Sequence, residues 1–587
     1  MTAAGLRSSE RPYALSIVDL GLLTGAVTAW LFAVSHTDVD RVGDLGLLAT
    51  VHPSYFVAPV LCVAGFVAGL LRGARRPPML AAYLVVVTLV IHATTPLLLD
   101  EPQYAWTYRY VGVIELISAR GAVSTPDDID QRWPAFLTGV AQFVEVSGVH
   151  PIQLAPWAPL FFNLAGSVLI FAVARVLAED RRTPYLTVLV FQCINWIERD
   201  HLAPTGFAFL LGLALMLVVV RWLRAASPGR ARPWSWLHAG LSPAPGPSRV
   251  GRLAALGALG VIMVALAASH PVSPFLIAGG VVALVVLGVV RPWWTGLVVL
   301  AVTLLYVIPR LGFVSAAFGL VDGFDLFHNA TGNTRSWGSR GQAVSAVTVR
   351  TLALVVWFLA LLAALRDRRS IGRVLAPLTL AFLPFALVLA QNHGAGAIYR
   401  VYLFSAPWCA LLIADMAVQL RWPRAVRATL AVITLSAMLF ATVQGRHGQL
   451  AVDRQLRTEV AASRYLYTYG RPGAAIILAT PNFPARVTGE YDRFNRGLAR
   501  DPDLVTGAGL TDVMLTDAYL PLVERFVRSY PGTTRYLVIS DGMRRYADYF
   551  GALPDGSLDL LDESLAAAGA WTVFYRNPDV VIYEMRA

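Results

Sequence analysis

The sequence contains no lysine, and its count of 48 for lysine plus arginine is therefore all arginine. Charged residues are also scarce at 14%, hydrophobic residues reach 56%, and the mean hydropathy is +0.58. A soluble domain of ordinary composition is about 25% charged, so this balance indicates a polytopic membrane protein. The lack of lysine, with the abundance of alanine, valine, leucine and glycine, favours a bacterial genome of high GC content.

The net charge of +11 is weak evidence for a nucleic-acid partner, and we expect none. The arginines cluster in short loops between apolar segments, where positive charge sets membrane topology. Cysteine is scarce too. Cys62, Cys193 and Cys409 all fall inside apolar segments, without CxxC or Cys/His spacing. Neither a disulfide framework nor a zinc site is supported.

Long apolar segments, by contrast, are frequent. About twenty apolar residues cross a bilayer as a helix. A window of that length predicts thirteen spans, at about 13–34, 53–71, 79–99, 156–178, 184–197, 204–223, 253–269, 274–290, 293–309, 347–365, 374–391, 401–419 and 427–443. The first has no small-residue cleavage site, so we expect it to remain as an anchor rather than to be removed as a signal peptide.

The arginine-rich loops alternate along the chain, which predicts that they face the cytoplasm. They lie at 72–76, 181–182, 224–252, 366–373 and 421–427. The amino terminus is then cytoplasmic and the carboxyl terminus extracytoplasmic, in a multi-pass protein of the bacterial plasma membrane. This topology places the candidate chemical residues on the external face.

Composition divides the chain into three predicted parts. Residues 1–78 form an amino-terminal two-helix hairpin, 79–443 a membrane core with a first external loop at 100–155, and 444–587 a soluble extracytoplasmic domain. In the last part, apolar runs at 475–478, 536–539 and 580–583 are typical of strands, and 517–530 and 558–568 of helices. We predict a small α/β domain that packs on the core or positions an acceptor.

Acidic residues stand at the ends of spans on the predicted external face. Asp100 and Glu101 follow the third span, and Glu198 and Asp200 occupy a short turn two spans later. Desolvation makes a carboxylate at the lipid–water boundary costly, and such a group can act as a base on a hydroxyl acceptor. The alternative is that Asp100 merely ends a helix at the headgroups.

The first external loop is predicted to contain two interfacial helices that roof a cavity and meet the acceptor. Between Trp133 and Val144 the apolar residues recur on one helical face. The stretch that starts at Tyr104 and runs to 117 is rich in aromatic residues, which favour the headgroup level.

An acidic cluster separates these two predicted helices. Asp127, Asp128 and Asp130 form a DxD-like pattern whose oxygens could hold a divalent cation such as Mg²⁺ or Mn²⁺. A solvated turn whose aspartates cap the next helix is the favoured alternative. No other cofactor is expected.

Taken together, these motifs resemble the GT-C superfamily of membrane glycosyltransferases, which use polyprenyl-phosphate sugars. The string from Asp100 and Glu101 to Tyr104 is similar to the acidic motif of its aminoarabinose and protein O-mannosyl transferases, and 197–201 sits where its second acidic motif belongs. The resemblance covers about 79–443. It departs in one respect, because the acidic motif follows the third span rather than the first.

The resemblance implies an inverting glycosyltransferase that moves a sugar from a polyprenyl-phosphate donor to a cell-envelope glycan, lipid or protein acceptor. Nucleotide sugars are cytoplasmic, so an externally facing enzyme is expected to use a lipid-linked donor. Asp100 would take the acceptor proton, and Glu101 would position the acceptor or tune that base.

Cationic residues near the external face are predicted to bind the donor phosphate. Arg400 is the first choice, because it precedes a span on the face where a topology-setting arginine is not expected. Weaker candidates are Arg199, His201, Arg340 and His393.

Two other classes of protein remain open. A polymerase or ligase of lipid-linked polysaccharide would differ by taking an oligosaccharide-diphosphate donor. A lipid or glycan transporter should show repeat symmetry and charged or broken helices at mid-membrane, whereas the acidic residues here cluster at span ends.

Overall fold

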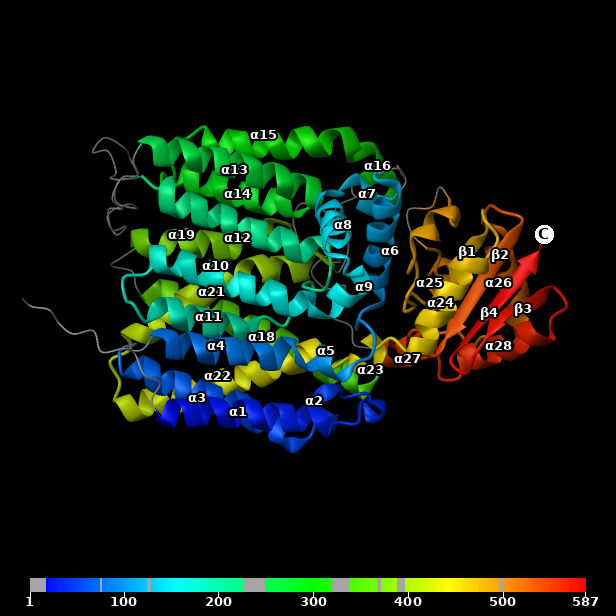
Figure 1. Ribbon diagram of the computed structural model, residues 1–587, viewed down its shortest axis with the longest axis horizontal. Coiled ribbons are helices and arrows are strands. Elements are labelled where there is room, and N and C mark those ends of the chain that lie inside the picture. Colours follow the sequence, from blue (N-terminus) through cyan, green and yellow to red (C-terminus); the bar gives the residue numbers. More distant parts are fainter. Residues whose placement is uncertain are drawn as a thin grey trace, which may run out of the picture.

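The computed structural model describes residues 17–73, 77–123, 128–225, 249–318, 338–366, 371–387, 396–496, 498 and 501–586. A bundle of roughly parallel and antiparallel helices makes up most of the molecule, and a small domain with a sheet lies beyond one end of it (Figure 1). Within the described residues, nine helices are long and apolar enough to cross a membrane. The predicted class is confirmed, whereas the number of thirteen spans stays a prediction, because four of them correspond to shorter apolar helices.

The bundle helices are apolar around most of their circumference, as expected for helices that face lipid and one another. They are α1 (Ile17–Ser35), α3 (Val57–Leu71), α4 (Pro77–His92), α10 (Ala158–Leu177), α11 (Thr183–Ile194), α12 (Pro204–Trp222), α13 (Arg249–Ser269), α14 (Ser273–Val286), α15 (Thr295–Val307), α18 (Arg340–Arg366), α19 (Ile371–Phe382), α21 (Gly396–Gln419) and α22 (Arg424–His447). Helix α21 packs against α11, α18 and α19 and is the most buried of the nine candidate spans.

Shorter elements cover the end of the bundle that faces the sheet domain (Figure 1). They include η1 (Val39–Arg41), α2 (Leu47–Thr50), η2 (Pro53–Phe56), α5 (Thr94–Leu98), α6 (Ala105–Arg120), α7 (Ile129–Arg132), α8 (Ala135–Ser147), α9 (Pro151–Leu154), η3 (Ala155–Trp157), η5 (Ile308–Arg310), α16 (Leu311–Phe318) and α23 (Leu450–Asp453). A further short element, η7 (Leu383–Phe385), follows α19 inside the bundle. The two helices predicted in the first external loop are α6 and α8. Each ends at a glycine in the left-handed conformation, Gly121 and Gly148, which is a common helix stop.

The carboxyl-terminal domain is built on a four-stranded sheet of order β1-β2-β4-β3. Its elements are α24 (Arg457–Tyr469), β1 (Ala475–Leu478), η8 (Gly489–Arg493), α25 (Leu504–Gly507), η9 (Asp517–Tyr519), α26 (Leu520–Arg528), β2 (Thr534–Ser540), α27 (Asp541–Phe550), α28 (Ser557–Ala567), β3 (Trp571–Arg576) and β4 (Val580–Arg586). Strands β1 and β2 are parallel, and β4 pairs antiparallel with β2 and β3. The three predicted strands correspond to β1, β2 and β4.

Helix α6 crosses the end of the bundle (Figure 1) and packs against the carboxyl-terminal domain, a contact that was not predicted, while its place at the membrane interface stays a prediction. Tyr108 is fully buried, and its hydroxyl donates to the carbonyl of Pro102 at 3.0 Å. At Gly112 an added Cβ would lie 1.9 Å from the carbonyl oxygen of Arg486. Because α6 shares one hydrophobic cluster with the sheet, the domain is packed onto the bundle rather than tethered to it.

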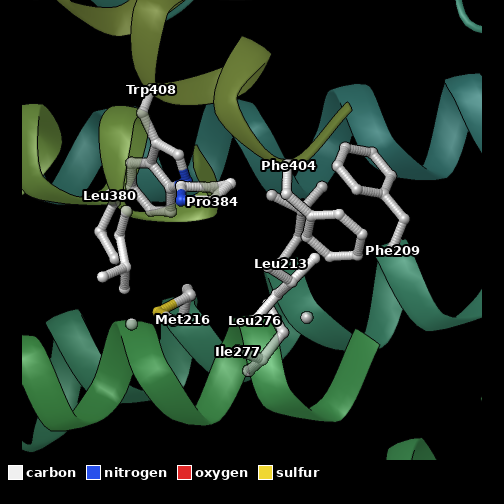
Figure 2. Close-up of a pocket in the computed structure, with 12 residues that line it drawn as sticks. Phe209, Leu213, Met216, Leu276, Ile277, Leu380, Pro384, Phe404 and Trp408 are labelled. Atoms are coloured by element: carbon white, nitrogen blue, oxygen red, sulfur yellow. The ribbon is translucent and has the colours of Figure 1, made fainter. Parts of the chain in front are cut away.

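A small apolar cavity of about 30 Å³ lies inside the bundle, between α12, α14, η7 and α21. Figure 2 shows its lining, which includes Met216, Ile277, Phe404 and Trp408. The lining offers no carboxylate, guanidinium or hydroxyl group. This cavity therefore has no side chain for acid–base chemistry or for binding a phosphate.

Candidate active site

A cavity of about 490 Å³ lies where the bundle meets the carboxyl-terminal domain. Four parts of the chain surround it: the start of α6, the turn between α11 and α12, the ends of α18, α21 and α22 with α23, and α27 with the loop after β1. Its lining residues are Tyr104, Ala105, Trp106, Trp196, Ile197, Glu198, Arg199, His201, Gln342, Ser345, Ala346, Val349, Tyr399, Gly445, Gln449, Val452, Asp453, Pro481, Asn482, Tyr546, Tyr549 and Phe550.

The turn between α11 and α12 is fixed by a buried ion pair. Asp200 accepts a hydrogen bond from Arg446 at 2.9 Å, and the side chain of Arg446 is only 2% exposed. Arg446 also donates to the carbonyl of Ile197 at 3.0 Å. Burial alone would raise the pKa of Asp200, but the charge of Arg446 holds this pKa below its usual range. Asp200 is therefore ionised and holds the turn against α22.

Polar side chains of three further helices complete this support. Asn163 on α10 donates to the other oxygen of Asp200 and accepts from Asn195 at 2.9 Å. His92 on α4 contacts Gln192 at 3.2 Å and lies 3.8 Å from Asp200. A buried pair that loses one partner leaves an uncompensated charge and costs about 3–5 kcal/mol. The network thus fixes the backbone that presents Glu198 and Arg199.

Glu198 is the carboxylate that faces the cavity. One of its oxygens accepts from Gln449 at 3.0 Å, and the other has no hydrogen-bond partner among the described residues. Burial, followed by the negative charge of Asp453, raises the pKa of Glu198 well above its usual range. One oxygen of Asp453 is likewise unpartnered in the described part of the chain. Two acids in one cavity, of which one holds its proton more tightly, are suited to proton transfer.

Positive charge lies on the bundle side of the same cavity. The guanidinium of Arg199 lies over the ring of Tyr399, 5.7 Å from its centroid. Arg400 follows Tyr399, and its charge repels that of Arg199. Across the ranges that the structure describes, neither arginine has a carboxylate within 4.0 Å. Arg199 lines the cavity and Arg400 does not. Two neighbouring guanidinium groups without a carboxylate partner are suited to bind an anion.

His201 separates this cavity from a smaller one. Its ring lies 5.4 Å from Tyr104 and 6.0 Å from Tyr110 between ring centroids, and its Nδ1 contacts the carbonyl of Glu198 at 3.0 Å. Burial lowers the pKa of His201 to about 4. The imidazole is thus neutral at neutral pH and packs as an aromatic ring, so it carries no charge to a donor phosphate.

The predicted acidic pair lies beside the cavity rather than in its lining. The carboxylate of Asp100 is 65% exposed and pairs with Arg457 at 2.8 Å. Glu101 lines a separate cavity of about 20 Å³ with Gln103 and His201. Burial raises the pKa of Glu101. The structure thus separates Asp100 and Glu101 from Glu198, and their predicted catalytic role stays a prediction.

Of the remaining predicted residues, Tyr104 lines the cavity, whereas Trp133 is buried elsewhere, 6.3 Å from Tyr306 between ring centroids. Arg340 is exposed at the start of α18 and is not in the lining. His393 lies outside the described residues.

Other side chains bind the described oxygens of the DxD-like cluster, and its predicted role in holding a divalent cation stays a prediction. Arg109 donates to Asp130 at 2.5 Å and to Asp128 at 3.0 Å. Tyr491 donates to the second oxygen of Asp128 at 2.7 Å. Asp128 also caps α7, as the favoured alternative predicts, but the turn is buried rather than solvated, because the side chains of Asp128 and Asp130 are only 4% and 11% exposed. Asp127 lies outside the described residues, and within the described ranges no group of three His, Cys, Asp or Glu side chains is placed to hold a metal ion.

Sequence reasoning missed the residues that α22 and α23 contribute, namely Arg446, Gln449 and Asp453. A signal for Arg446 was present. It stands at the predicted external end of a span, where a topology-setting arginine is not expected, as Arg400 also does. Gln449 and Asp453 carried no such signal, because they follow the last span in a segment that reads as ordinary domain sequence.

No family model matches the chain, and no curated protein matches it in sequence. Among solved structures, the apo oligosaccharyltransferase of Archaeoglobus fulgidus superposes with a TM-score of 0.50 and 11% identity, over 81% of this chain and 71% of its own. The likeness shows that this chain has the fold of that glycosyltransferase, which is the GT-C fold. The predicted resemblance is thereby confirmed for the fold.

Two further GT-C structures are similar at lower scores. ArnT from Cupriavidus metallidurans in the apo state gives a TM-score of 0.45 at 12% identity, over 86% of this chain and 97% of its own. The arabinofuranosyltransferase AftD from Mycobacteria gives a TM-score of 0.49 at 15% identity, over 87% of this chain and 40% of its own. At identities this low a likeness shows the fold alone, and the activity of this chain depends on its own residues.

Proposed function

We propose that this GT-C chain is a glycosyltransferase that moves a sugar from a polyprenyl-phosphate donor to a hydroxyl acceptor in the 490 Å³ cavity. The observation that carries the proposal is the juxtaposition of Glu198 and Arg199 in one cavity at the end of a membrane bundle. A transfer of this kind needs a base for the acceptor and a cation for the leaving phosphate, and the two residues provide both.

Glu198 is the proposed base. Its unpartnered oxygen is free to accept the proton of an acceptor hydroxyl, and its raised pKa makes it a stronger base than an exposed glutamate. As the new bond forms at the anomeric carbon, the bond to the phosphate oxygen breaks. The phosphate leaves with the electron pair, and the proton stays on Glu198. A single displacement of this kind inverts the anomeric centre.

Arg199 and Arg400 are the proposed partners of the donor phosphate. Arg400 is partly buried and Arg199 is exposed. Neither has an acid to neutralise it in the described structure, so an incoming phosphate relieves the repulsion between them. Their place at the bundle end suits a donor whose lipid chain stays in the bilayer while its head enters the cavity. Arg400 was the first choice from the sequence and is kept, and Arg199, a weaker candidate from the sequence, becomes an equal partner of the donor phosphate in this proposal.

The test uses the full chain in detergent with a panel of radiolabelled polyprenyl-phosphate sugars and a lipid extract as the acceptor source. We expect label from one donor to move to an acceptor, and Glu198→Gln to slow transfer by about two to four orders of magnitude while donor binding stays intact. Arg199→Ala should weaken binding of the polyprenyl phosphate itself.

The matched controls are Glu145→Gln, an exposed glutamate on α8, and Arg421→Ala, an exposed arginine at the opposite end of the bundle. Both should match the unmodified chain. Transfer from an oligosaccharide diphosphate but from no monophosphate donor would overturn the proposal in favour of a polymerase or ligase.

A further inference from the structure

The carboxyl-terminal domain contributes one whole wall of the cavity, and the chemistry of this wall differs from that of the bundle side. Tyr546, Tyr549 and Phe550 of α27 line it, together with Pro481 and Asn482. We call these five residues the aromatic wall. It carries no formal charge, whereas the opposite side carries Arg199. A charged ligand group therefore belongs on the bundle side, and an uncharged one on the aromatic wall.

The aromatic wall is built before any ligand arrives. The ring of Phe550 lies 4.7 Å from Tyr546 and 5.0 Å from Tyr549 between centroids. The carbonyl of Tyr549 accepts from the backbone of Ser339 at 2.9 Å. Asn482 donates to the carbonyls of Val452 and Gly542 at 2.8 and 2.9 Å, which ties α27 to α23. Fixed rings bind a ligand without loss of side-chain freedom.

The wall also occupies a place in the fold where ligands commonly bind. Strands β1 and β2 are parallel, and the loop with Asn482 and helix α27 follow their carboxyl ends. In α/β domains the crevice outside the carboxyl ends of parallel strands is the usual ligand site. In this domain the carboxyl-terminal edge of β1 and β2 faces the cavity that contains Glu198, not solvent.

Hydrogen-bond acceptors without partners surround the same space. Among the described residues, Glu198, Asp453 and Gln342 each have one buried side-chain oxygen with no hydrogen-bond donor, and all three residues line the cavity. Such oxygens are costly to leave unbonded. Their natural complement is a ligand with several hydroxyl donors. The aromatic wall also offers no cation to pair with an anionic ligand group at this position.

We infer that the acceptor is a neutral glycan, and that one of its sugar rings packs on the aromatic wall while its hydroxyls bond Gln342, Asp453 and Glu198. The C–H face of a sugar ring is weakly positive and complements the negative face of an aromatic ring. This inference rests on the proposed function and narrows its acceptor from a glycan, lipid or protein to an uncharged sugar.

The test measures binding to the full chain, purified in a detergent without a sugar headgroup, by saturation-transfer difference NMR. The probes are linear mannotriose, an arabinofuranosyl trisaccharide, a glucuronate-containing trisaccharide and an acetylated, amidated tripeptide. We expect saturable binding of a neutral trisaccharide that Tyr546→Leu weakens at least tenfold. Tyr546→Phe keeps the ring and should keep the affinity. Tyr469→Leu, at a tyrosine 66% exposed on α24, is the matched control and should leave it unchanged.

Three results would overturn the inference: no neutral trisaccharide binds, the tripeptide binds in a manner that depends on Tyr546, or the anionic trisaccharide binds more tightly than the neutral ones. Polyprenyl-phosphate binding measured on the same Tyr546→Leu sample separates the two proposals. If that binding is retained and still depends on Arg199, the proposed donor site stands even where the acceptor inference fails.

Discussion

The pH dependence of transfer should reveal the pairing of Glu198 with Asp453. A general base acts only when deprotonated, so the rate falls as the pH drops through the pKa of Glu198. Burial and then the charge of Asp453 raise that pKa. We therefore expect the acidic limb of kcat/KM well above pH 4.3, the usual pKa of a glutamate. Asp453→Asn removes the negative charge, lowers the pKa of Glu198, and should move the limb to lower pH.

The size of the shift follows from the contact through Gln449, which donates to Glu198 at 3.0 Å and also contacts Asp453. Two carboxylates that share one site raise the pKa of one of them, and each pKa unit corresponds to about 1.4 kcal/mol of interaction. Water in the open cavity screens part of this interaction. We expect a shift of about one to two pH units.

The assay is the initial rate of transfer from pH 4.5 to 9 at fixed ionic strength, with the unmodified chain, Asp453→Asn and the control Glu145→Gln measured in parallel. The control should reproduce the unmodified profile. A limb that stays in place in Asp453→Asn, or that moves to higher pH, would refute the electrostatic coupling. A near-full rate in Glu198→Gln would refute the choice of base itself.

The remaining predictions concern the acidic pair, the donor site, the domain contact and the topology. Asp100→Asn should keep at least about half of the transfer rate, because an exposed pair such as Asp100 with Arg457 contributes only about 0.2–1 kcal/mol; a loss of two or more orders of magnitude in the same assay would restore Asp100 as the base. Arg400→Ala should weaken polyprenyl-phosphate binding, and Arg400→Lys should recover only part of it, since lysine lacks the planar fork that bonds two phosphate oxygens; equal affinity in both variants, measured by titration, would argue against a phosphate contact. Gly112→Val should lower the thermal midpoint in detergent by the equivalent of about 1–3 kcal/mol, because α6 and the Arg486 backbone leave no room for a side chain, and an unchanged midpoint would show that the domain is not packed there. A reporter that works only outside the cytoplasm should be active when fused after Ala587, and its inactivity would place the cavity on the other face.

The membrane class and most of the secondary structure could be predicted from the sequence, because both depend on local signals. Apolar segments of sufficient length report helices directly, and the short apolar runs at 475–478 and 580–583 report strands. Helix α6 was located correctly for the same reason. Its contact with the carboxyl-terminal domain was not predicted, since an aromatic-rich helix has the same sequence pattern whether it faces lipid or another domain. The contact with the domain becomes evident only in the structure, where the backbone of Arg486 lies directly against Gly112.

The sequence by itself determined the turn that carries Glu198 and Arg199, because a charged cluster between two apolar spans stands out along the chain. Only the tertiary structure decided that Glu198, rather than Asp100, faces the large cavity. Gln449 and Asp453 come close to Glu198 although about 250 residues separate them along the chain, and the buried pair of Asp200 with Arg446 spans a similar distance. Such pairings depend on how helices pack around one another, and no local pattern of residues records which helix ends meet.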